Sequence, residues 1–98
     1  MIEAIYDKKI ECWLSEHREE IVEQLMALVR IPSVRGTAEA GAPFGAECKR
    51  ALDATQTLFV QSGFATRSEA ERGYIVARRA GTGKTIALMA HADVVPAE

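Results

Sequence analysis

The sequence lacks the features that mark several large protein classes. It has only two cysteines, Cys12 and Cys48, and they are far apart. No export signal is visible, because the N-terminus has no basic start followed by an apolar core. We therefore expect a cytoplasmic protein with reduced, buried thiols rather than a disulfide framework. No apolar run approaches the ~20 residues that a membrane-spanning helix needs, so a membrane is not an expected partner.

An excess of charge of one sign is also missing. Twelve basic and 14 acidic residues give a formal net charge of −2, which supplies no basic surface for nucleic acid. A phosphate-binding loop is excluded, because Gly83-Lys84-Thr85 would need a glycine at the position of Arg78. No residue is therefore assigned to an organic cofactor. At 98 residues the chain is one domain at most, or part of one.

The first pattern that is present is amphipathic. Residues 3–30 contain no proline or glycine and stop before Pro32, which disfavours helix at the residue preceding it. A break at residues 14–16 stays open, since Ser15 could cap a second segment. Residues at spacings of three and four predict one helix with an apolar stripe, formed by Tyr6, Ile10, Trp13, Leu14, His17, Ile21, Leu25 and Leu28.

Three side chains in this stripe have alternative roles. His17 is interpreted as a partly buried packing residue, because nothing near it resembles a cluster of metal ligands. Tyr6 and Trp13 are interpreted as anchors of the core or of an interface rather than as platforms for a substrate.

The remaining chain predicts an α/β fold of two helices followed by a small sheet with a β-hairpin. Residues 31–42 carry turn signals, and Ser33 within them is expected to serve a turn or a cap. Residues 43–62 have the apolar face of a second helix. Residues 64–68 predict a short strand, and residues 73–90 predict an antiparallel hairpin that turns at its Gly-rich centre.

Residues that could bind a metal or take part in catalysis lie near the end of the chain. The uninterrupted apolar run at residues 86–90 predicts a strand buried on both faces, and Pro96 ends it. His91 and Asp93 then lie where the strand passes into a loop, which is where open α/β sheets bind ligands. Imidazole is a good zinc ligand, and a carboxylate two residues away on an extended segment faces the same side. We therefore predict His91 as a metal ligand and Asp93 as the carboxylate that orients it.

Three motifs together resemble the M20 family of metallopeptidases. His91-Ala92-Asp93-Val94-Val95-Pro96 resembles its first metal-ligand motif, and Leu28-Val29-Arg30-Ile31-Pro32-Ser33-Val34 resembles the segment after its first helix. Pro43-Phe44-Gly45, opening a helix, resembles the PepV-like dipeptidase branch. The motifs occur in the order of the family and at plausible spacing across the chain.

The resemblance implies a zinc-peptidase-like catalytic domain of which residues 1–98 are the N-terminal fragment, without the lid domain. The full-length parent would hydrolyse dipeptides or short peptides with two zinc ions, with His91 as one ligand and Asp93 as a catalytic carboxylate. The family's other ligands and its general base would lie beyond Glu98, so we expect this fragment to be inactive and to bind zinc weakly or not at all. An exposed apolar face would favour self-association.

Two alternatives stay open. An aminoacylase or deacylase of the same family would share the metal ligands, and manganese or cobalt could replace zinc at a site of mixed imidazole and carboxylate ligands. Outside the enzymes, the chain could be a non-catalytic α/β interaction module in which His91 and Asp93 cap a turn.

Overall fold

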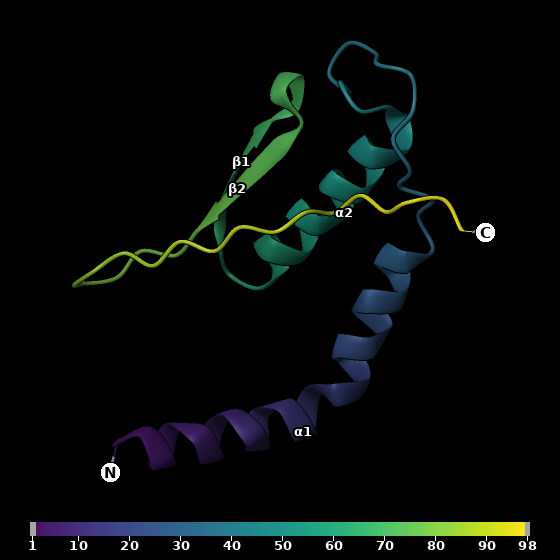
Figure 1. Ribbon diagram of the computed structural model, residues 1–98. Helices are drawn as coiled ribbons and strands as arrows, with labels where there is room; N and C mark the ends of the chain where they lie inside the picture. The colour runs from purple at the N-terminus through teal and green to yellow at the C-terminus, as the bar shows by residue number, and fades with distance from the viewer. Residues whose placement is uncertain (1, 98) are drawn as a thin grey trace.

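A computed structural model describes residues 2–97 of the chain (Figure 1). Two helices precede two antiparallel strands, so the protein is α/β with a small sheet, as the sequence predicts. The elements in chain order are α1 (Ile2–Val29), α2 (Ala46–Gln61), β1 (Ala65–Glu69), the 3₁₀ helix η1 (Ala70–Arg72) and β2 (Tyr74–Arg78).

Helix α1 is one unbroken helix of 28 residues, so the break considered at residues 14–16 does not occur, although the helix bends along its length (Figure 1). It ends at Val29, after which the Ile31 N–H bonds the Leu28 carbonyl at 3.1 Å in a tighter turn and Pro32 follows. No helix of the described residues combines the length and the apolar character needed to cross a bilayer.

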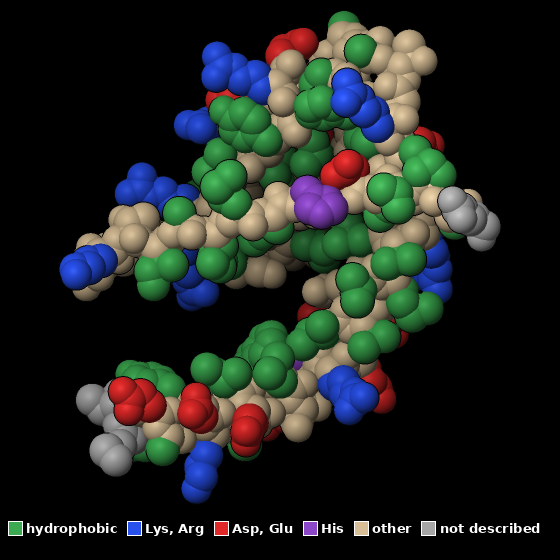
Figure 2. Space-filling model, viewed as in Figure 1, with side chains coloured by type: hydrophobic (Ala, Val, Ile, Leu, Met, Phe, Trp, Pro, Cys, Tyr) green, Lys and Arg blue, Asp and Glu red, His purple; other side chains and the backbone are tan. Residues whose placement is uncertain are grey.

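The apolar stripe of α1 is not packed as the sequence predicts. Tyr6 and Trp13 are 58% and 53% exposed, so neither is a core residue. Apolar side chains line the face of the helix that is turned towards the rest of the molecule, across an open space (Figure 2). His17 is half-buried as expected, because its ring stacks on Trp13 with the centroids 4.0 Å apart.

The core is small and lies where the connection after α1 meets α2. Its buried apolar residues are Ile31, Ala42, Cys48 and Ala51, and Ser33 is buried with them. The expectation of buried thiols is confirmed for Cys48 and wrong for Cys12, which is exposed on α1. The difference follows from the helices, since the part of α1 that carries Cys12 stands away from the other elements (Figure 1).

Helix α2 begins at Ala46, three residues later than the predicted start of the second helix at residue 43. Gly45 precedes it with φ 100° and ψ 163°, a backbone conformation that is essentially restricted to glycine and cannot continue a helix backwards. At the other end, Ser62 caps the helix and Gly63 follows with φ 89°, which confirms the predicted stop.

The hairpin is formed by other residues than the predicted range 73–90. Strand β1 pairs with β2 in the register Ala65↔Arg78 to Glu69↔Tyr74, and η1 with Gly73 makes the connection. Phe64 packs edge-on against Phe59 of α2 at 5.3 Å, and Gln56 donates to the Thr66 hydroxyl at 3.0 Å. The sheet is therefore fastened to α2 through its first strand.

Residues 80–97 contain no helix or strand, so the predicted buried strand at 86–90 is wrong. Ile86, Leu88 and Met89 are 85%, 94% and 98% exposed. An apolar run is buried only where another element packs against it, and here β2 pairs with β1 and not with residues 86–90. The extended segment instead crosses the molecule in front of α2 (Figure 1).

Candidate functional site

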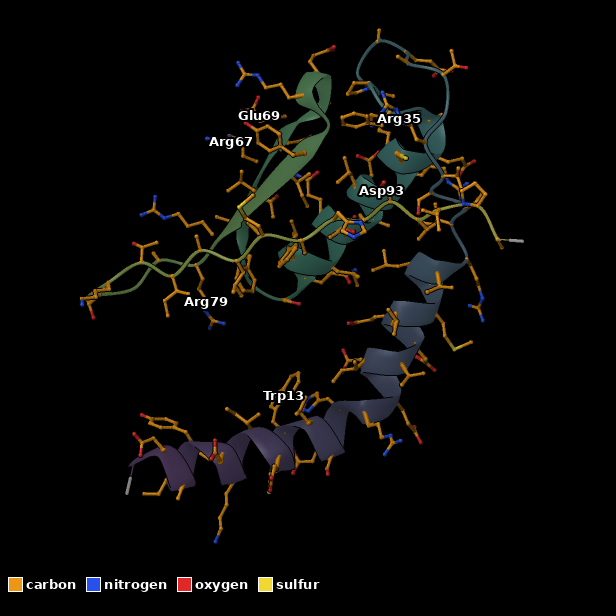
Figure 3. The ribbon with its side chains drawn as sticks, viewed as in Figure 1. Trp13, Arg35, Arg67, Glu69, Arg79 and Asp93 are labelled. Carbon is orange, nitrogen blue, oxygen red and sulfur yellow. The ribbon has the colours of Figure 1, made fainter. Side chains whose placement is uncertain are left out.

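His91 and Asp93 lie together on the extended segment that follows the sheet. His91 Nδ1 is 2.9 Å from Asp93 Oδ1 and 3.1 Å from the Asp93 carbonyl oxygen. The expectation that extended backbone places both side chains on one side is met, and they are in direct contact. Figure 3 shows Asp93 where this segment crosses α2, well separated from Trp13 on α1.

The partners of Nδ1 determine which nitrogen of His91 carries the proton. A carboxylate oxygen and a carbonyl oxygen are both acceptors, so Nδ1 has to be the donor. In the neutral ring the lone pair is then on Nε2, which has no protein partner within residues 2–97. The His91 and Asp93 side chains are 83% and 58% exposed, so a cation or a ligand can reach Nε2 from solvent.

A third residue that sequence reasoning did not assign to the site is Ser33. Its hydroxyl donates to the Ala92 carbonyl at 3.1 Å, and its carbonyl accepts from the Val94 N–H at 3.0 Å. Ser33 was expected only in a turn or a cap. It does follow such a turn, since its N–H bonds the Ile31 carbonyl at 2.8 Å. Ser33 and Ala92 are 59 positions apart in the sequence, which explains why no spacing rule indicates the contact.

His91 and Asp93 fit one ligand of a zinc site and its hydrogen-bonded carboxylate, but they do not form a complete site. A histidine whose second nitrogen donates to a carboxylate is the usual arrangement of a metal-bound imidazole. Within the described residues, however, no three side chains of histidine, cysteine, aspartate or glutamate gather closely enough to hold a metal ion. His17 is engaged elsewhere, with Nδ1 2.8 Å from the Trp13 carbonyl oxygen. A structural or catalytic zinc takes three or four protein ligands, so further ligands are needed.

Comparison of the chain with protein-family models, with curated protein sequences and with solved structures gives no match.

Proposed function

We propose that the chain supplies a metal ligand, His91, and its orienting carboxylate, Asp93, to a metal-dependent hydrolase of dipeptides or short peptides. The observation that carries the proposal is the 2.9 Å contact between His91 Nδ1 and Asp93 Oδ1 on an exposed ring, which leaves Nε2 available to a cation. The motifs at residues 28–34, 43–45 and 91–96 resemble M20 metallopeptidases and support a peptide as the substrate.

In this proposal the chain's own residues prepare a ligand rather than complete a reaction. Asp93 accepts a hydrogen bond from the Nδ1–H, which fixes the tautomer of His91 and leaves Nε2 as the atom that can bind a metal. Two zinc ions held by the complete site would polarise the scissile carbonyl and lower the pKa of a bound water. Because the described residues offer His91 no second and third ligand, these have to be supplied from outside them. The 98-residue chain by itself is then inactive and binds zinc weakly or not at all.

The test is hydrolysis by the protein that the complete gene encodes, with and without a chelator. His91→Ala should abolish cleavage of dipeptides, as should the chelator, and added zinc should restore the wild-type protein only. His17→Ala is the matched control, because it removes the chain's other histidine from an unrelated helix and should leave cleavage unchanged. Cleavage that survives both the chelator and His91→Ala would refute the proposal.

The same assay separates the related enzymes. N-acyl amino acids replace dipeptides as substrates if the parent is an aminoacylase or deacylase of the same family. Manganese or cobalt, added in place of zinc after chelation, shows which of these ions restore cleavage, because a site of mixed imidazole and carboxylate ligands can accept each of them.

One observation favours the interaction module as a second candidate. Leu88 and Met89 are almost fully exposed in an uncharged stretch, as in a segment that another protein covers. Sequencing the gene beyond Glu98 distinguishes the two candidates. An aspartate and a Glu-Glu pair downstream favour the hydrolase, and a stop codon favours the module.

A further inference from the structure

Ser33 is a buried polar residue, only 2% exposed, and all of its polar groups have partners. Its hydroxyl and carbonyl bond to residues 92 and 94, its N–H bonds the Ile31 carbonyl, and the Cys48 thiol donates to its carbonyl at 3.3 Å. A buried hydroxyl is unfavourable unless it is hydrogen-bonded, and an alanine would fill similar space without that requirement. The bond to Ala92 is therefore the contribution that distinguishes serine at this position.

The two bonds from Ser33 enclose Asp93. Ala92 carries the carbonyl before it and Val94 the N–H after it. Within residues 2–97, these are the two hydrogen bonds that join residues 80–97 to the rest of the chain. The orientation of the peptide groups on both sides of Asp93 is consequently set by one residue.

The peptide group between Asp93 and Val94 contacts both Ser33 and His91. A trans peptide directs its C=O and its N–H to opposite sides. The Val94 N–H bonds Ser33, and the carbonyl of the same peptide group, which belongs to Asp93, accepts from His91 Nδ1 at 3.1 Å. Ser33 and the imidazole thus lie on opposite sides of one planar group, so turning that group changes both contacts.

Ser33 itself is held by both helices. Ile31 and Pro32, just after α1, form tight turns with it and with Val34, with N···O distances of 2.8 Å. Cys48 in the first turn of α2 contacts its carbonyl. Because residues in or next to both helices hold Ser33 in place, Ser33 can in turn hold residues 92–94 of the exposed segment in place.

We propose that Ser33 is the positioning residue of His91, which it acts on through the backbone of residues 92–94 so that Nδ1 keeps its proton and Nε2 stays free. The use of this ring by a metal rests on the function proposed above. The coupling itself is a property of the metal-free protein and is measured there.

The experiment compares Ser33→Ala, Ser33→Thr and Ser33→Val in the 98-residue chain. Threonine and valine have nearly the same shape and differ by the hydroxyl. An effect of packing would therefore appear in both of these variants, whereas an effect of losing the hydroxyl would appear with valine and not with threonine. Ser62→Ala is the matched control, because its hydroxyl also donates to a backbone carbonyl, that of Leu58 at 2.8 Å, but at the C-terminal end of α2. Circular dichroism confirms that each variant retains its helices.

The readouts are the ¹⁵N shifts of the His91 ring, which report its tautomer, and the hydrogen exchange of the Val94 N–H. Loss of the hydroxyl leaves the acceptor of the Val94 N–H in place, so faster exchange reports the loosened segment. Ser33→Ala and Ser33→Val should accelerate this exchange about fivefold, the factor that corresponds to one net hydrogen bond, and should shift the ring away from the Nδ1-protonated tautomer. Ser33→Thr and Ser62→Ala should retain both wild-type values.

Unchanged tautomer and exchange in Ser33→Ala and Ser33→Val would overturn the inference, even if His91→Ala abolished hydrolysis by the complete protein. The converse result, a clear coupling in the metal-free chain, supports the inference even where chelation leaves hydrolysis unaffected. If both proposals hold, Ser33→Ala in the complete protein weakens binding of zinc alone by about 10–100-fold, as loss of a group supporting a metal-bound histidine does.

Discussion

Gly45 gives the sharpest test of the fold that positions the site, because its backbone requires glycine for two reasons. Its φ of 100° lies in a region that other residues occupy only with strain. A Cβ built on it would lie 2.9 Å from both the Cα and the N of Gly36, and backbone atoms cannot rotate away as a side chain can. Gly45→Ala should therefore destabilise the protein.

The magnitude follows from these two terms. The backbone conformation alone costs about 1–3 kcal/mol. The stiffer unfolded chain of the alanine variant offsets about 0.4–1 kcal/mol of this, and the clash with Gly36 adds to it. A net loss of about 2 kcal/mol is a large share of the stability of a chain this small.

Gly36→Ala is the matched control for the same crossing. A Cβ at Gly36 would lie 3.9 Å from the Gly45 Cα, which is ordinary van der Waals contact, and its φ is not positive. Urea unfolding followed by helical circular dichroism measures both variants. With a slope of about 1 kcal/mol/M, the midpoint of Gly45→Ala should fall by about 2 M, whereas that of Gly36→Ala should stay near wild type. Equal midpoints for the two variants would refute the reasoning.

The other predictions concern the hairpin, the thiols and the exposed segment. Gly73→Ala should lower the urea midpoint, because a Cβ there would lie 2.6 Å from Phe44 Cδ2 at a φ of 75°, whereas Gly81→Ala, with open space around it, should not. Cys12 should react with iodoacetamide in the folded protein while Cys48 is protected until unfolding, and equal labelling rates would contradict this burial. The wild-type chain should self-associate in sedimentation velocity through its exposed apolar stretch, and Leu88→Lys should reduce the association; a wild-type chain that is monomeric at all concentrations would count against it.

The sequence predicts a helix end correctly where a residue at that end determines it. Pro32 ends α1 and Gly63 follows α2, since both act through their own backbone. The start of α2 was predicted too early, because nothing in the sequence indicates that Gly45 takes a positive φ. Both helix ends and the start of α1 are thus placed to within one residue from sequence, whereas the start of α2 is not.

Features that depend on contacts between residues far apart in the sequence are predicted less well. The apolar run at 86–90 has the composition of a buried strand, but burial is decided by neighbours that the run itself does not encode. For the candidate site, His91 and Asp93 were identified because their contact spans two residues on extended backbone. Ser33 was not, because its role depends on the fold that brings residue 92 to it.

The hydrogen bonds between Ser33 and residues 92 and 94 also bear on the order in which the chain folds during its synthesis. Ser33 leaves the ribosome 59 residues before Ala92, which at synthesis rates of about 5–20 residues per second is an interval of roughly 3–12 s. Throughout it, the Ala92 carbonyl is not yet available to the serine hydroxyl, while α1 and α2 have time to form. Both helices are thus synthesised before the histidine, which reaches a contact site that they can already have formed.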